Sequence, residues 1–208
     1  VSGGALIIRN KKFTSRMPLG AKLFHPSGGL SGLKDRIYPL ETYKIRSLYK
    51  SGLGKPYHFL LKKLNLMSNT MNESFYDYYS LPRWHAKMVL HLFDLLEAQL
   101  NHRKKIAEIY ASYLPDKIFM FDRKKTKEAV SLSSNLRFPI FVDNRSELIK
   151  KLKKHGVYIS DIWYTDVAPK CPNAVSDSKI ILNLPTHINV TEDEAVRISE
   201  IINQWIQK

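Results

Sequence analysis

The segment FYDYYSLPRW, residues 75–84, is the stretch richest in side chains that could hold a ligand. It combines five aromatic residues with one acid and one arginine. Aromatic faces stack on bases and sugars, and arginine pairs with phosphate or carboxylate. Ordinary packing at the start of a helix explains the same cluster equally well. The residues alone therefore leave both interpretations open.

A second candidate is IWYTDVAPKCPNA, Ile162–Ala174, which we expect to be a loop leaving the end of a strand. Such loops often carry ligand contacts, although many are only connections. Two further residues, Asn183 and His187, are of catalytic types. The strand end and turn in which they stand favour a structural role.

The sequence lacks the motifs of a phosphate-binding loop, a dinucleotide-binding turn or a zinc protease. Its seven His show no metal-ligand spacing, and its one Cys, Cys171, has no evident His partner. The single Cys excludes a disulfide framework and fits a cytoplasmic protein. No apolar run reaches the roughly 18 residues that a membrane span needs.

The basic charge is concentrated at the start of the chain. The net charge is +14 over 208 residues, and residues 1–70 contain 13 Lys or Arg against two acids. Such a patch can attract nucleic acid, anionic lipid or phosphate-bearing small molecules. A solvated basic face is the simpler explanation, because no nucleic-acid-binding motif accompanies the charge.

Hydrophobic periodicity predicts a helical first half. Helices are expected over 39–50 and 57–66, after a loop over 18–32. The clearest pattern lies over 82–113, where apolar residues recur at three- and four-residue steps. This spacing predicts one long helix, of a length that often bridges two domains. A short strand is expected at 3–9.

Residues 115–208 are expected to form a compact α+β domain in the order strand, strand, helix, strand, strand, helix. The helix over 145–155 ends at Gly156, a typical residue after a helix C-terminus. The last helix begins with a capping-box pattern, Thr191 and Glu194. The strands are predicted at Lys117–Phe121, Leu136–Val142, Val157–Trp163 and Ile180–Leu184.

Three stretches carry patterns that occur together in one enzyme family. GGALIIRN, residues 3–10, is a glycine turn followed by a strand. CPNAVSDSKIILNLPTHINVTEDEAVRISEII, residues 171–202, contains the elements P-x-A, L-P-x-H and T-x-x-E. LHLFDLLEAQLNHRKKIAEIY, residues 90–110, contains R-R-x-x-A-x-x-Y-like positions at Arg103, Lys104, Ala107 and Tyr110. In order and spacing these stretches resemble the DegT/StrS-type (DegT/DnrJ/EryC/StrS) aminotransferases.

The resemblance implies an α/β fold, namely the fold of the fold type I transferases that depend on pyridoxal phosphate. This chain looks like the C-terminal part of such an enzyme. Residues 1–74 would be a basic remnant of the large domain, 75–114 the connecting helix and 115–208 the small α+β domain. Family members carry their Schiff-base lysine just before the glycine pair. That position lies upstream of Val1, so the chain alone is expected to be inactive and not to bind the cofactor.

The resemblance also implies substrates and contacts. Family members transfer an amino group, with glutamate as donor, to nucleotide-linked keto sugars for polysaccharide or amino-sugar biosynthesis, and a homodimer is expected. An Asn that reaches the cofactor phosphate in many members aligns with Tyr78, which can still donate a hydrogen bond. No metal and no nucleic acid are implied. Substrate contacts are expected from Tyr76, Tyr79, Arg83, Trp163 and Tyr164.

Two other functions stay open at this point. The scaffold could serve as a non-catalytic binding module that uses residues 1–70 on nucleic acid or an anionic surface. It could also be a remnant that dimerises with an intact paralogue through the long helix.

Overall fold

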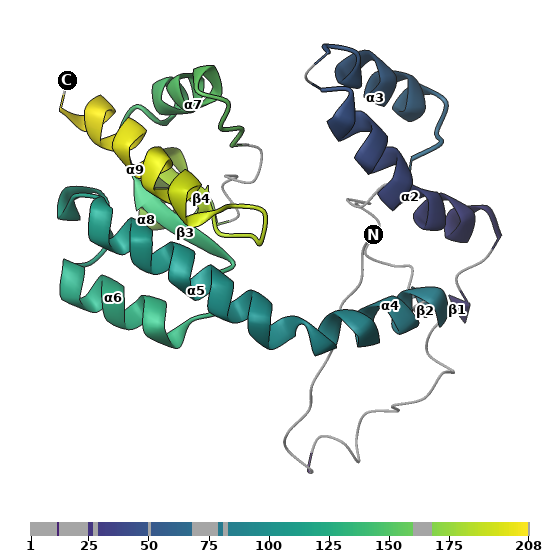
Figure 1. Cartoon of the computed structure of the whole chain (residues 1–208), viewed down its shortest axis with the longest axis horizontal. Helices are drawn as coiled ribbons and strands as arrows, with labels where there is room; N and C mark the ends of the chain where they lie inside the picture. Colours follow the sequence, from purple (N-terminus) through teal and green to yellow (C-terminus); the bar gives the residue numbers. More distant parts are fainter. Residues whose placement is uncertain are drawn as a thin grey trace. The chain divides into compact units, whose positions relative to one another are not determined.

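A computed structural model describes residues 12, 25–26, 29–49, 51–67, 79–80, 83–159 and 168–207. The chain forms two compact units, Val1–His91 and Leu92–Lys208, each of which is described by itself (Figure 1). The expected strand at 3–9 lies outside the described residues.

The first unit is built mainly from helices. α2 (Gly29–Ser47) and α3 (Gly54–Lys63) form a helical hairpin, and α4 (Arg83–Asp94) begins in this unit. Two short strands, β1 (His25–Pro26) and β2 (Tyr79–Ser80), pair in parallel. Both helices of the hairpin were predicted, but α2 begins ten residues before Pro39 and includes part of the expected loop.

A close backbone contact at Gly54 joins α2 to α3. The Gly54 amide donates to the carbonyl of Leu48 at 3.0 Å, and a Cβ at position 54 would lie 2.6 Å from the Ile45 carbonyl oxygen. Only glycine fits without a shift of the backbone. Ile45 and Leu61 are the buried side chains of this hairpin among those described.

The second unit contains a two-stranded sheet among helices. Its β3 (Arg137–Phe141) and β4 (Ile181–Pro185) are antiparallel, with Phe138 opposite Leu184 and Ile140 opposite Leu182. These four side chains are buried, so one face of the sheet belongs to the core. The other elements are α5 (Leu96–Tyr113), the 3₁₀ helix η2 (Asp116–Ile118), α6 (Arg123–Leu132), α7 (Arg145–Lys154), α8 (Pro172–Ile180) and α9 (Glu192–Ile206).

The core of this unit is shared by helices and sheet. α5 packs against α6, α9 and β3, and α7 packs against α9. Ile106 of α5, Leu148 of α7 and Ile202 of α9 are fully buried in one cluster with the sheet side chains. Burying a side chain of this size stabilises a fold by about 1.5–3 kcal/mol. The sheet is thus held by the helices that cover it.

Several predicted elements of this unit are confirmed. β3, β4 and α7 lie within two residues of their expected bounds, and Gly156 follows α7 with a φ of 80°. At the start of α9 the Thr191 hydroxyl accepts from the Glu194 amide at 3.2 Å. The Glu194 carboxylate accepts from the Thr191 amide at 3.0 Å, which completes the capping box.

Other predictions are wrong. The long helix is two helices, α4 and α5, separated at Leu95. Residues 117–121 form no strand, and the first two of them belong to η2. The Arg123 guanidinium pairs with Asp116 and donates to the Leu114 carbonyl at 2.8 Å. These bonds hold η2 against the end of α5. The helices α6 and α8 were not predicted. A strand was predicted over Val157–Trp163; residues 157–159 are irregular, and residues 160–163 lie outside the described part.

A carboxylate links the two helices of the hairpin. Glu41 of α2 accepts hydrogen bonds from the Tyr57 hydroxyl of α3 and, at 3.0 Å, from the Lys44 ammonium. These bonds stabilise the charged form and lower the pKa of Glu41 below its usual 4.5. Because the pKa is lower in the folded chain, this stabilisation is present above pH 4.5 and is lost as the pH falls through the folded pKa.

We therefore expect Tyr57→Phe to reduce the acid sensitivity of the hairpin. Urea unfolding followed by helical circular dichroism should show a smaller loss of stability between pH 6 and pH 3 in the variant than in the parent. Tyr43→Phe is the control, because Tyr43 is 72% exposed on α2. Equal acid sensitivity of the parent and Tyr57→Phe would show that the hydrogen bond has no part in it.

Candidate functional site

Residues of two sequence motifs meet at one end of the β3–β4 sheet. Arg103 of α5 donates to the Leu136 carbonyl at 3.0 Å and to the Thr186 hydroxyl at 3.2 Å. The fully buried Thr186 donates to the Asn135 carbonyl at 2.6 Å. These bonds connect the R-R-x-x-A-x-x-Y pattern of α5 to the L-P-x-H pattern that ends β4.

Tyr110 makes a second link between the same two motifs. Its hydroxyl donates to the Pro185 carbonyl at 3.0 Å, and its ring lies 5.5 Å from that of Phe138. Burial, with a smaller effect of the Glu194 carboxylate, raises the pKa of the Tyr110 phenol. The hydroxyl therefore stays protonated and remains a donor.

Asn135 completes this group at the turn between α6 and β3. Its φ is 47°, a left-handed conformation that Asn tolerates better than most residues. Its side-chain amide donates to the carbonyls of Val130 at 2.8 Å and Ser133 at 3.0 Å. We call Arg103, Tyr110, Asn135 and Thr186 the α5–β4 clamp. Its side chains bond to one another and to backbone carbonyls at the end of the sheet, so we assign it a role in positioning the sheet.

Two of the predicted ligand-binding residues are described by the structure, and the others lie outside the described residues. Tyr79 lies in β2, paired with His25, and Arg83 is the first residue of α4. Tyr79 thus lies beside β1, whose residues were predicted to be part of a loop. Their contacts stay predictions. Outside the described residues lie Tyr76, Tyr78, Trp163 and Tyr164.

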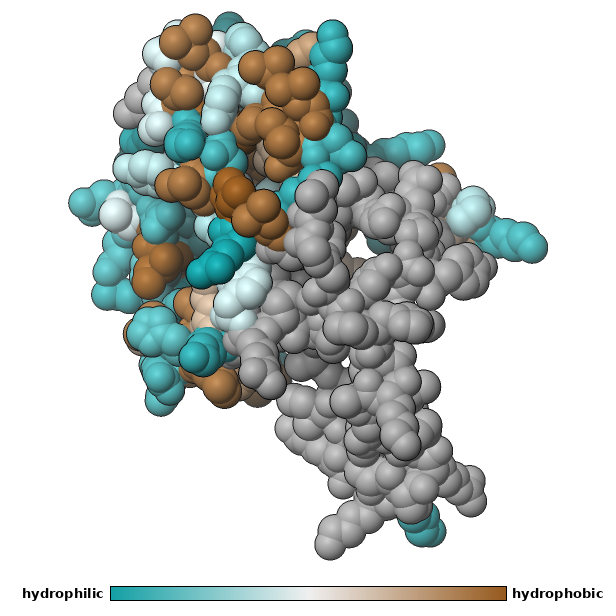
Figure 2. All heavy atoms as spheres, turned by 90° about the vertical axis from the view of Figure 1, so that its right-hand side faces the viewer, coloured by the Kyte–Doolittle hydropathy of each residue, from teal (hydrophilic) through white to brown (hydrophobic). Residues whose placement is uncertain are grey.

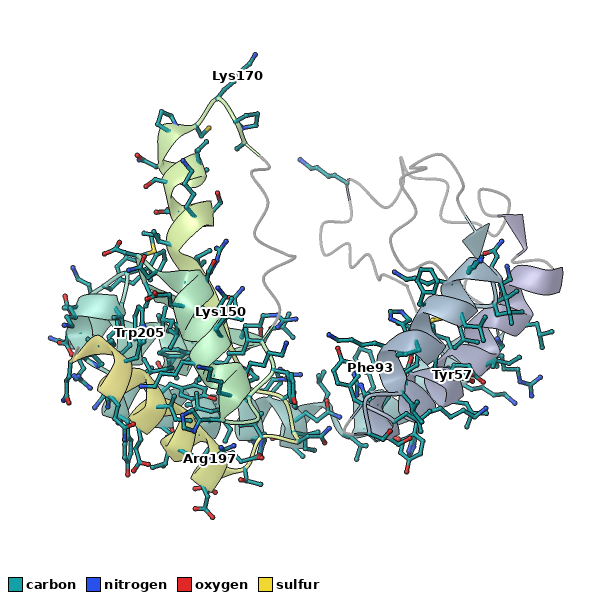
Figure 3. The ribbon with its side chains drawn as sticks, turned by 90° about the horizontal axis from the view of Figure 1, so that it is seen from above. Tyr57, Phe93, Lys150, Lys170, Arg197 and Trp205 are labelled. Carbon is teal, nitrogen blue, oxygen red and sulfur yellow. The ribbon has the colours of Figure 1, made fainter. Side chains whose placement is uncertain are left out.

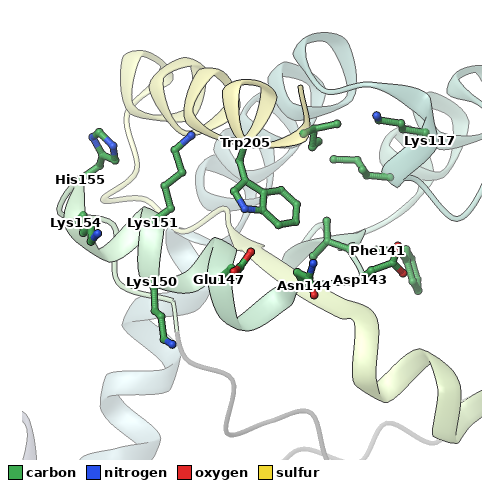
Figure 4. Close-up of a pocket in the computed structure, with 13 residues that line it drawn as sticks. Lys117, Phe141, Asp143, Asn144, Glu147, Lys150, Lys151, Lys154, His155 and Trp205 are labelled. Carbon is green, nitrogen blue, oxygen red and sulfur yellow. The ribbon is translucent and has the colours of Figure 1, made fainter. Parts of the chain in front are cut away.

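Sequence analysis gave no sign of an open depression of about 970 Å³ in the second unit. It lies between α7, the last turn of α9 and the end of β3 (Figure 4). Trp205 of α9 and Lys150 and Lys151 of α7 are among the residues that line it. Figure 3 shows the same helices from another direction, with α8 leading away to Lys170.

The chemistry of this depression is that of a weak anion site. Lys151 and Lys154 line it and form no ion pair with another described residue, but Asp143 and Glu147 line it too. Within the described part of the chain, no group of His, Cys, Asp and Glu could hold a metal ion. In the same part, no helix is both long and apolar enough to cross a membrane.

Comparison with known proteins identifies the group to which these motifs belong. The sequence model of the DegT/DnrJ/EryC1/StrS aminotransferase family matches residues 68–203, well over half of the chain. The chain belongs to this family. The match includes every residue of the α5–β4 clamp.

A solved structure agrees with this assignment. A DegT DnrJ EryC1 StrS aminotransferase from Brucella abortus is similar in fold, with a TM-score of 0.50 and 21% sequence identity. The similarity covers 66% of this chain and 40% of that one, so the chain spans less than half the length of this relative. The comparison with curated proteins gives no match.

The family is generally dependent on pyridoxal phosphate, and the described residues do not fit that cofactor. A lysine that holds it as a Schiff base is desolvated or placed beside other charged groups in a pocket. No lysine among the described residues is buried; the buried polar side chains there are Asn135, Thr186 and Ser199. We therefore assign no step of cofactor chemistry to them.

We expect Arg103→Met to destabilise the second unit by about 1–3 kcal/mol, because two acceptors at the sheet end lose a charged donor. Arg137→Met, an exposed position on β3, should change stability by less than about 0.5 kcal/mol. Urea unfolding measures both. In a double-mutant cycle with Thr186→Val, the two effects should couple by at least about 0.5 kcal/mol. Additive effects would contradict the clamp.

Proposed function

We propose that this chain is the C-terminal portion of a fold type I aminotransferase that acts on nucleotide-linked keto sugars with glutamate as amino donor. The observation that supports this most is the family match over residues 68–203. The match spans α5, β3, β4 and α9, and the motif residues within it, Arg103, Tyr110 and Thr186, bond to one part of the fold.

The chain would supply the connecting helix and the small domain. In this proposal 115–208 is the small domain, 75–114 the connecting segment and 1–74 the tail of the large domain. Pyridoxal phosphate, when bound, supplies the electron sink for the amino transfer. Its lysine is proposed to lie upstream of Val1, a few residues before the pair Gly3–Gly4, so residues 1–208 alone would be inactive.

The start of α4 is the proposed substrate side. The first amides of a helix have no partner within it and carry partial positive charge, which favours phosphate. Arg83 at the first helical position adds a donor pair suited to the diphosphate of a nucleotide sugar. Tyr76 and Tyr79, which precede Arg83 in the sequence, would stack on the base or the sugar, with Tyr78 toward the cofactor phosphate. Trp163 and Tyr164 are proposed as further substrate contacts.

We further propose a cytoplasmic homodimer working in cell-surface polysaccharide or amino-sugar synthesis. These proposals derive from the family resemblance.

The coding DNA directly upstream of Val1 tests the proposal. We expect an open frame with a lysine shortly before Gly3. The extended protein should bind pyridoxal phosphate on that lysine, found by borohydride fixation and peptide mass, and should convert glutamate to 2-oxoglutarate with a keto-sugar nucleotide. Residues 1–208 should do neither. An in-frame stop codon immediately upstream, or transamination by residues 1–208 alone, would contradict it.

Arg83→Met in the extended protein should raise KM for the nucleotide sugar by about tenfold or more, the cost of a lost bond to a charged group. Its KM for glutamate should stay unchanged. Lys87→Met is the matched control, one turn further along α4 and exposed. Equal effects of the two substitutions would indicate general electrostatics and would remove Arg83 from the substrate site.

A further inference from the structure

α3 exposes the side that does not pack in the hairpin. Gly54 and Leu61 are buried, and Tyr57 and His58 are half-buried. Because residues three and four apart share one side of a helix, these positions define the packed side. The opposite side belongs to solvent. Figure 2 shows one face of the α2–α3 hairpin, on which hydrophobic side chains gather between hydrophilic ones.

Large apolar side chains lie along this exposed side. Leu53, Leu60 and Leu64 are 59%, 50% and 57% exposed, and Phe59 is 68% exposed. The leucines are seven and four residues apart, which places them in one stripe along the helix. Phe59 points to a different side of the helix, roughly 100° or more around the axis from the leucines. Such a row differs from scattered surface leucines, which need no explanation.

Three lysines surround Phe59. Lys55, Lys62 and Lys63 are four residues before it and three and four residues after it, so all three share its side of the helix. Residues 53–64 contain no acid. None of the three lysines forms an ion pair with another residue in the described part of the chain. We call the exposed side of residues 53–64 the α3 surface.

We propose that the α3 surface binds the surface of an anionic lipid membrane. A basic amphipathic helix lies in the plane of such a membrane, with its apolar side chains at the boundary of headgroups and acyl chains. Phe59 and Leu60 would enter that boundary. The lysines, whose long aliphatic stems reach outward, would pair with lipid phosphates.

The charge and the apolar stripe together favour lipid over other partners. A second copy of the chain would place lysines against lysines, because the same patch faces itself in a two-fold dimer. A nucleic acid would attract the lysines but would leave the leucines in water. An anionic bilayer satisfies both, and the +11 of residues 1–70 suits an extended negative surface.

Sedimentation of the purified chain with vesicles tests the proposal. We expect binding to phosphatidylcholine vesicles containing phosphatidylglycerol, and none to phosphatidylcholine alone. K55Q/K62Q/K63Q should weaken binding by about fivefold for each lysine. F59S/L60S should weaken it by about tenfold or more, with the charge unchanged. Circular dichroism checks that each variant stays folded. If F59S/L60S does not fold, L64S, which changes another exposed leucine, replaces it in the binding measurement.

Matched controls lie in the second unit. K124Q/K125Q/K127Q changes three exposed lysines of α6, and F121S changes an aromatic side chain that is 49% exposed. Both should bind like the parent. The proposal is overturned by no vesicle binding at low salt, or by equal losses in the two lysine triples. It is also overturned if duplex DNA binds while vesicles do not.

Discussion

The second unit depends on the hydrogen bonds that tie α5 to the end of β4. A two-stranded sheet is marginally stable by itself, and β3 and β4 are five residues each. Arg103 and Tyr110 bind three carbonyl or hydroxyl acceptors at its end, while α5 and α9 cover its buried face. A buried polar group without a partner is costly. Thr186 and Asn135 therefore require the bonds that they make.

This constraint joins parts of the chain that are far apart in the sequence. Arg103 and Thr186 are 83 residues apart in the chain but within hydrogen-bonding distance in the fold. The same holds for Tyr110 and Pro185, 75 residues apart. In this chain, residues of the motifs that resemble those of an enzyme family make structural contacts between α5 and β4. The ligand-binding residues that we propose for that enzyme stand elsewhere, at the start of α4.

Sequence patterns predicted the elements whose signals are local. β3, β4 and α7 carried apolar alternation or a glycine stop, and α9 carried its capping box. Two predictions failed where local signals were misleading: η2 includes the first residues of a predicted strand, and α2 begins ten residues before Pro39 and runs through it. For the candidate site, the residue types near Arg83 could be predicted from the sequence. It could not show that β1 pairs with this segment, nor that Arg103 reaches Thr186, because both contacts join distant positions.

Native-state hydrogen exchange of the intact chain tests the central claim most directly. If the clamp unites sheet and helices, the slowest amides of α5, β3, β4 and α9 should open together, with one free energy and one dependence on urea. Opening of β3 and β4 at clearly lower free energy than α5 and α9 would contradict the account, since the sheet would then form without depending on the clamp.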